Sequence, residues 1–453
     1  MAAGALLLGK SAPSANNCFG LHQMRFTRAV AWFFLCALVL PLHLACAGAD
    51  ESARVAPKPS EKRALQTVTE APGTRSVQAL VIYACDSNDH YPLPSRGFRD
   101  SLYARITDFY KTMSYGKHRL SFREANHDDV FFVSQHDAGY YNSHYDKRRH
   151  VRGFGMFNEE ILQQVLVANG EELFDNVDIL IMVGTDGGPG WYAPGVNATG
   201  FGMLGVDFKT ANRTFGRWQR QGGFTLEIGS DFGTSSPDDD VYLTPQEIQW
   251  TIAHEYAHWL GLGHRGNNLG IYSLMSRQLF GNDRMPQFGP PPLDIFHIMD
   301  LGWLDRQDSS RVIKVRHSGK VMLNQVRAKS GPVVAQVDWG QPRAGIYITY
   351  HRQASNPFDG SYVGEGLLVW DKRRGRVDLR TPSLDGATGL DHLDRGLDRG
   401  GRAADFLQKT SGRFTVFSES AVRATRANSR PRIVLSDVQL QGEQATFQVE
   451  FGN

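Results

Sequence analysis

The chain has 453 residues, of which 41% are hydrophobic and 21% are charged, and its formal net charge is +2 at pH 7. This composition excludes a collagen-like or largely disordered chain, and the small net charge excludes a broad electrostatic field for nucleic acid or anionic membranes. A chain of this length is expected to form about two or three domains, each able to bury a core.

The N-terminus predicts an export signal. Two arginines precede an apolar run over residues 29–44, and Ala45-Cys46-Ala47 then supplies the small residues of a cleavage site. The run is shorter than the ~20 apolar residues of a membrane-spanning helix. We therefore expect a signal peptide over residues 1–47, a secreted protein and no stable membrane span, with a lipid anchor at Cys46 as a minor alternative. Cys85 is then the only remaining cysteine, which predicts no internal disulfide.

Residues 48–75 lack an apolar period, which predicts a linker or the remnant of a pro-segment. Strand-like and helix-like stretches then alternate, and this favours an α/β or α+β catalytic domain over residues 76–305. The predicted strands and helices are Val77–Cys85, Phe98–Met113 (helix), Leu120–Phe122, Asn158–Val167 (helix) and Val177–Val183. An acidic loop, Ser236–Asp240, could bind calcium or could simply be a solvated surface loop.

Past Leu301-Gly302-Trp303 the sequence changes to short alternating apolar runs, which are typical of an all-β domain. We assign this sandwich-like domain to residues 306–453. Its predicted strands lie within Val312–Val315, Val333–Val337, Ile346–Tyr350, Leu367–Trp370 and Ile433–Phe451.

The most informative segment runs from Thr244 to His264 and reads TPQEIQWTIAHEYAHWLGLGH. Thr244 and Pro245 are a helix start signal. His254 and His258 are four residues apart, so their rings stand on the same side of the predicted helix and could share one Zn²⁺. Glu255 is offset beside that face, which suits a base that takes a proton from metal-bound water.

Gly261 can end this helix in a left-handed turn, and His264 then returns as a third ligand. Three protein ligands leave one position open, which indicates a catalytic rather than a structural zinc. Met275 follows in a predicted turn, either as a hydrophobic base beneath the ligands or as an ordinary core residue. His297 could be a further ligand, but we interpret it as a core or surface histidine.

The segment HEYAHWLGLGH followed by SLMS resembles the metzincin clan of zinc metalloproteases. Further stretches resemble the immune inhibitor A family of secreted metallopeptidases, and gametolysin-like proteases come second. These stretches are FYKTMSYGKHRL, DIFHIMDLGWL, GIYITYHRQ with EGLLVWD, GRAADFLQKTSGRFT and IVLSDVQLQGEQATFQVEF. Together they cover roughly residues 78–451 in the order found in that family.

The resemblance implies one catalytic zinc held by His254, His258 and His264, with Glu255 as the base. It also implies a metzincin-like catalytic domain and endoproteolysis of extracellular proteins or peptides. The sequence departs from related clans at Arg277, where some carry a metal-reaching tyrosine, and at Tyr350 and His351, where the family often has Glu and Asn.

Two alternatives to a secreted endopeptidase stay open. One is a secreted binding or adhesion protein with a vestigial zinc site, although such a protein has no use for the carboxylate of Glu255. The other is a zinc hydrolase of glycoprotein or cell-wall material; the loop of Trp191 and Tyr192 could line its cleft or could be a simple surface loop.

Overall fold

The computed structural model describes part of the chain beyond the expected leader. The described residues are 75–87, 93–127, 130–143, 145–146, 151–185, 198–201, 203–228, 245–264, 269, 273–276, 290–338, 345–352, 366–373, 376–380, 414–417 and 432–452. All of them belong to one compact unit, Val68–Asn453. The expected signal peptide, the Cys46 anchor and nearly all of the linker therefore lie outside the described residues. No described helix is long and apolar enough to cross a bilayer.

The first sheet has the order β2-β1-β6-β10-β7, and β3 also pairs with β1. All pairs in it are parallel except β10 with β7, so β7 is an antiparallel strand at one edge of the described sheet. The strands are β1 (Arg75–Cys85), β2 (His118–Glu124), β3 (Phe132–Val133), β6 (Ile179–Thr185), β7 (Ala198–Phe201) and β10 (Gly223–Ile228).

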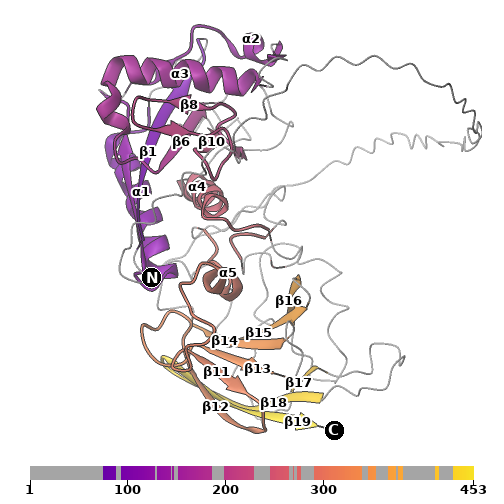
Figure 1. The fold of residues 1–453 in the computed structure, drawn as a ribbon. Coiled ribbons are helices and arrows are strands. Elements are labelled where there is room, and N and C mark those ends of the chain that lie inside the picture. Colours follow the sequence, from indigo (N-terminus) through magenta and orange to yellow (C-terminus); the bar gives the residue numbers. More distant parts are fainter. Residues whose placement is uncertain are drawn as a thin grey trace, which may run out of the picture. The chain divides into compact units, whose positions relative to one another are not determined.

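Helices cover both faces of this sheet, because its central strands are apolar on both sides. Alternate residues of β1 enter two different cores: Val81 lies with side chains of α1 and α4, and Ile82 lies with those of α3. In Figure 1, α3 and α4 accordingly lie on opposite sides of the strands. The helices are α1 (Arg96–Met113), α3 (Gly153–Asn169) and α4 (Pro245–Trp259), and the smaller elements are α2 (Ala138–Ser143), η1 (Glu171–Phe174), β4 (Tyr145–Asp146), β5 (Val151–Arg152), β8 (Phe208–Lys209) and β9 (Thr214–Phe215).

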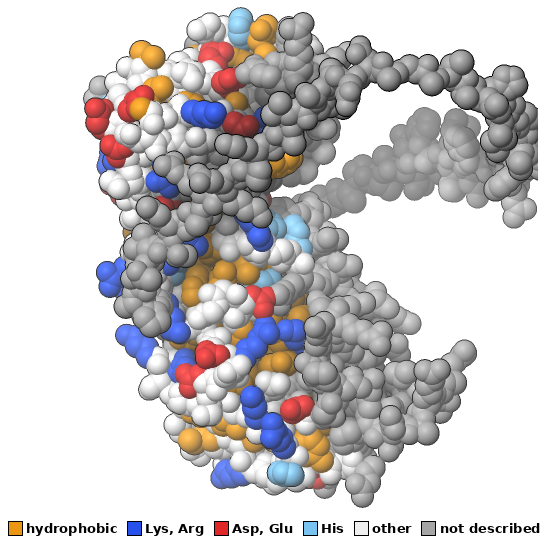
Figure 2. Space-filling view, in the orientation of Figure 1, with side chains coloured by type: hydrophobic (Ala, Val, Ile, Leu, Met, Phe, Trp, Pro, Cys, Tyr) orange, Lys and Arg blue, Asp and Glu red, His pale blue; other side chains and the backbone are white. Residues whose placement is uncertain are grey.

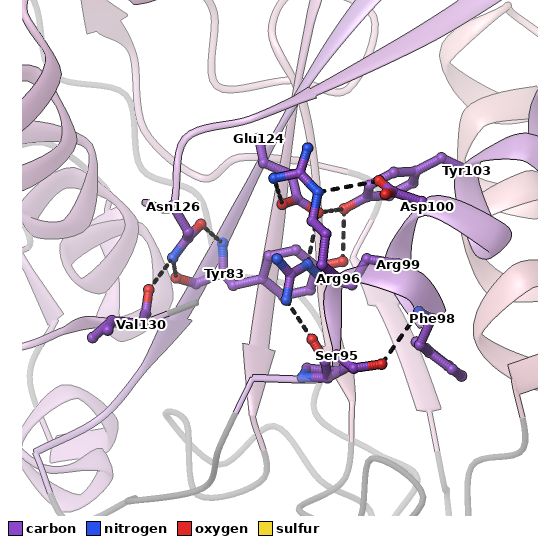
Figure 3. A network of polar contacts seen from close by, with 11 residues as sticks. Tyr83, Ser95, Arg96, Phe98, Arg99, Asp100, Tyr103, Glu124, Asn126 and Val130 are labelled. Carbon is purple, nitrogen blue, oxygen red and sulfur yellow. Dashed lines mark hydrogen bonds and ion pairs between the residues drawn. The ribbon is translucent and has the colours of Figure 1, made fainter. Parts of the chain in front are cut away.

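A buried polar network joins α1 to the ends of β1 and β2 (Figure 3). The guanidinium of Arg99 contacts the carboxylate of Glu124 at 2.8 Å, and the hydroxyl of Tyr103 donates to the same carboxylate oxygen at 2.7 Å. The hydroxyls of Tyr103 and Tyr83 are 2.7 Å apart. A buried charge requires such partners, so this network fixes the helix against the sheet.

From β11 onward all the described elements are strands, and they form two further sheets. One has the order β11-β13-β14-β15-β16 and the other the order β12-β19-β18-β17. Side chains from both sheets meet in one apolar core, so the sheets pack face to face. The strands are β11 (Val312–Val315), β12 (Gly319–Asn324), β13 (Val334–Val337), β14 (Gly345–His351), β15 (Gly366–Arg373), β16 (Arg376–Arg380), β17 (Phe414–Phe417), β18 (Arg432–Gln441) and β19 (Gln444–Gly452).

A short helix, α5 (Ile295–Asp300), packs on the outer face of β14 and β15. The ring centroid of Phe296 lies 4.8 Å from that of Tyr347 and 6.2 Å from that of Trp370. Every residue of β14 is buried, because one face of the strand enters the sandwich core and the other meets α5. The predicted mixture of helices and several β-sheets is confirmed.

The charged surface is mixed, as the composition predicts. Figure 2 shows lysine and arginine side chains interspersed with aspartate and glutamate on the drawn face, without a large field of one sign.

Candidate metal centre

Helix α4 carries two of the three predicted ligands on one face. The ring centroids of His254 and His258 are 4.7 Å apart, as expected for residues one helical turn apart. Around His254 the helix is buried from Ile248 to Ala257, while His258 is half-buried. Most of the helix is therefore packed in the core, and the two imidazoles lie on one face near its C-terminal end.

The chain reverses directly after α4. Gly261 has a φ of +103°, a conformation that favours glycine, and the N–H of Leu262 donates back to the carbonyl of Ala257. This turn brings His264 to the helix, with its ring centroid 5.1 Å from that of His254 and 4.6 Å from that of His258. One ligand nitrogen from each of the three histidines lies within 4.8 Å of the others, so the cluster could hold a metal ion.

The two helix-borne rings are oriented by hydrogen bonds from Nδ1. In His254 this nitrogen contacts the carbonyl of Leu274 at 2.7 Å, and in His258 it contacts the carbonyl of Leu262 at 2.8 Å. Because a carbonyl only accepts, each Nδ1 carries the hydrogen and Nε2 keeps its lone pair for a metal. The Nε2 atoms of His254 and His264 are 3.1 Å apart, close to the about 3.3 Å between two nitrogens in a tetrahedral zinc site.

The electrostatics also suit a metal. Burial, followed by the proximity of His258, lowers the pKa of His254 to about 3, although its bond to Leu274 opposes the shift. Burial lowers the pKa of His258 as well. Both rings are therefore neutral at pH 7, and the neutral imidazole is the form that binds metal.

Glu255 is buried beside the cluster, with 4% of its surface exposed. Burial raises the pKa of its carboxyl to about 7, and a hydrogen bond from Gln219 limits the rise. The side-chain amide of Gln219 donates to the carboxylate at 3.0 Å and to the backbone carbonyl of Glu255 at 2.7 Å. The carboxylate is thus held in one place and has a pKa near the neutral range in which a general base works best.

Met275 lies in a buried turn, Ser273–Ser276, that contacts the ring of His254 through its backbone. The hydroxyl of Ser273 accepts the N–H of Met275, and the preceding residue, Leu274, supplies the carbonyl that orients His254. Met275 shares its core with Ile252 and Ala253 of α4. Its thioether therefore contributes packing, and the turn's backbone contributes the contact to a ligand.

A search of protein-family models finds no match to this chain, and a search of curated proteins finds none either. The assignment of a family therefore depends on the residues themselves.

Sequence reasoning missed the residues that support the ligands. Gln219 lies in a turn between β9 and β10, 36 positions before Glu255, and no local pattern connects the two. Asp294 was detectable in part, because an Asp before an apolar run is a helix start signal, and it does cap α5. His297 is fully buried beside Asp294, which fits the interpretation as a core residue.

Several expected features lie outside the described residues. They are the acidic loop Ser236–Asp240 with its possible calcium site, Arg277, and the aromatic pair Trp191 and Tyr192.

Proposed function

We propose that the protein is a secreted zinc-dependent endopeptidase that hydrolyses peptide bonds of extracellular proteins. The observation that carries the proposal is the convergence of His254, His258 and His264 with the buried carboxylate of Glu255 beside them. Three nitrogen ligands leave one coordination position of a tetrahedral ion open, which is the arrangement of a catalytic zinc.

Zinc suits this set of donors better than a hard cation does. The ligand atoms are three imidazole nitrogens, whereas calcium and magnesium require oxygen ligands. When bound, zinc supplies Lewis-acid activation of a water molecule and stabilises negative charge on the scissile carbonyl. The chain itself supplies neutral, pre-oriented rings, so little reorganisation accompanies binding.

We assign the role of general base to Glu255, because it directly follows His254 on α4, is buried and has a carboxyl pKa raised to about 7 by that burial. It accepts a proton from the attacking water and later delivers it to the leaving amine, which requires a pKa near neutrality. A cation close by would favour the carboxylate form, and burial favours the protonated form, so the two effects oppose each other at this group. Gln219 holds the carboxylate in place during both transfers.

The position of β7 at the edge of the first sheet favours an extended peptide as the substrate. Strand β7 is the last strand on that side of the described sheet, and both β7 and β10 contact α4. An extended peptide can pair with such an edge through main-chain hydrogen bonds. A segment bound there would lie next to the helix that carries His254 and Glu255.

We further propose that the chain is a metzincin-like protease related to the immune inhibitor A family. Support comes from the order of its motifs and from the buried turn of Met275 next to the ligands. A binding protein with a vestigial site would not require a buried carboxylate that is fixed by Gln219, so the position of Glu255 favours the enzyme.

The test is a casein digestion by wild type and by the Glu255→Gln variant. We expect the wild type to lose cleavage with a chelator and to regain it with added Zn²⁺. The variant should retain stoichiometric zinc but cleave about 10²–10⁴-fold more slowly, because it lacks the base. A wild type without chelator-sensitive cleavage would contradict the proposal.

A further inference from the structure

Asp294 lies at the point where α5 meets the metal centre, and both of its carboxylate oxygens are engaged. One oxygen accepts the backbone N–H groups of Phe296 and His297, each at 3.0 Å, and so caps α5. The other accepts the hydroxyl of Ser273 at 2.7 Å and lies 2.6 Å from Nδ1 of His297. Burial raises the pKa of this carboxyl, but His297 and Ser273 together outweigh burial and lower the pKa to about 2, so the carboxylate stays ionised.

His297 connects this carboxylate to the loop of the third ligand. Its Nε2 lies 3.1 Å from the carbonyl of Gly263, the residue that directly precedes His264. Both ring nitrogens thus face oxygen atoms: Nε2 donates a hydrogen bond to the Gly263 carbonyl, and Nδ1 lies within ion-pair distance of the Asp294 carboxylate. The side chain of His297 is fully buried, so these contacts are shielded from water.

The same loop is held at three successive carbonyls. Arg220 donates to the carbonyl of Gly261, His258 to that of Leu262, and His297 to that of Gly263. His264 itself is exposed and has no helix to hold it. The last of the three contacts is the nearest along the chain to the ligand, so it limits the freedom of His264 most directly.

Ser273 connects Asp294 to the first ligand as well. Its hydroxyl donates to Asp294 and accepts the N–H of Met275, which fixes the turn around Leu274. The carbonyl of Leu274 in turn orients His254. One carboxylate therefore acts on two of the histidines through two chains of contacts, one through Ser273 to His254 and one through His297 to the loop of His264.

We propose that Asp294 and His297 are a positioning pair that holds His254 and His264 at metal-binding distance and slows the release of the metal. The proposal rests on the metal site of the proposed function, but it concerns metal affinity and not catalysis. Partners behind metal-binding histidines contribute about 10–100-fold to metal affinity in other proteins.

The experiment measures zinc affinity and zinc release in the purified full-length protein, by competition with a chromogenic chelator. In the His297→Phe variant, which fills the volume but donates nothing, we expect affinity to fall about 10–100-fold and release to become faster. His297→Gln, whose amide can still donate to the Gly263 carbonyl, should be intermediate. The visible absorption of Co²⁺ in the site should change in His297→Phe, because the geometry of the ligands relaxes.

His351→Phe is the matched control. His351 is also a buried histidine with a hydrogen-bonded ring, its Nε2 lying 2.8 Å from the hydroxyl of Thr349, but it lies in β14. We expect this variant to lose some stability without losing zinc affinity. If His297→Phe does not fold, Ser273→Ala and His297→Gln provide the same comparison.

Wild-type affinity, release rate and Co²⁺ absorption in the folded His297 and Ser273 variants would overturn the positioning role while leaving the proposed function intact. A wild type that binds no zinc would instead refute both proposals at once.

Discussion

His254 and His258 lie on α4, whereas His264 lies on the loop that follows it, and the two segments are held in different ways. The helix fixes its two ligands by backbone geometry and by packing, since His254 is only 1% exposed. The loop ligand is exposed, and its backbone is fixed by side chains from Arg220, His258 and His297. A regular element can therefore position a ligand through its own repeat, while a loop needs partners from elsewhere in the fold.

Deleting one ligand from each segment gives the largest effect and tests this comparison. We expect His254→Ala and His264→Ala both to lose stoichiometric zinc and to reduce proteolysis by at least about 10³-fold, because the Lewis acid is lost. In the metal-free state the two variants should differ in their free energy of unfolding. His254→Ala leaves a cavity and an unpaired Leu274 carbonyl, which costs about 2–4 kcal/mol, whereas the exposed His264 should cost less than about 0.5 kcal/mol. Urea unfolding of the metal-free proteins measures this difference. Equal losses of stability in the two variants would contradict the distinction between the helix-borne and the loop-borne histidine.

Acid should weaken the support of the helix. Behind α4, Nε2 of His118 contacts the hydroxyl of Tyr256 at 2.8 Å, and Trp303 packs on the same ring. Burial, followed by the charge of Arg75, lowers the pKa of His118 to about 4. The unfolded chain binds this proton near pH 6.5, so the stabilising contribution is complete above that pH and is lost as the pH falls towards 4.

The expected loss is about 3 kcal/mol over that interval, from about 1.4 kcal/mol for each pH unit between the two pKa values. Because buried His254 also has a lowered pKa, the difference between wild type and His118→Gln in urea unfolding of the metal-free proteins at pH 7, 5.5 and 4 measures this contribution. His118→Gln should retain a partner for Tyr256 but show a flatter dependence on pH, and an unchanged slope would show that another group is responsible.

Gly261→Ala should give the smallest overall effect, and its change in stability should arise in the loop that carries His264. A Cβ at this position would meet Arg220 at 3.0 Å, and the φ of +103° is unfavourable for alanine, so we expect a loss of about 1–3 kcal/mol. Gly263→Ala is the matched control, since among the described residues other than its chain neighbours no atom lies within 4 Å of its added Cβ. Thermal unfolding and zinc affinity of the two variants separate strain in the turn from the general cost of replacing a glycine.

The spacing of residues within one helix and its turn predicted the cluster well. The separation of four between His254 and His258 determines that they share a face, and Gly261 has the left-handed conformation that its position after the helix suggested. The alternation of strands and helices likewise predicted the layered first sheet, and each predicted strand of that sheet overlaps an observed one.

The supporting contacts could not be predicted, because they depend on the tertiary fold. Gln219 and Glu255 are 36 positions apart, and His118 and Tyr256 are 138 positions apart. Such contacts join a side chain to a distant residue at a single point, so they leave no periodic pattern. His297 illustrates this limit: its chemistry suggested a ligand or a core residue, and only the position of the Gly263 carbonyl shows what it faces.

The packing of α5 against the C-terminal strands affects where the chain can be truncated. Phe296 is held between Tyr347 and Trp370, and Lys372 lies over its ring at 5.1 Å. A chain cut after residue 305 would lose these three side chains and leave Phe296, on the helix that carries Asp294 and His297, without them. The C-terminal strands therefore support the helix that carries Asp294 and His297, and we expect a shortened chain to bind metal more weakly even though it keeps all three histidines.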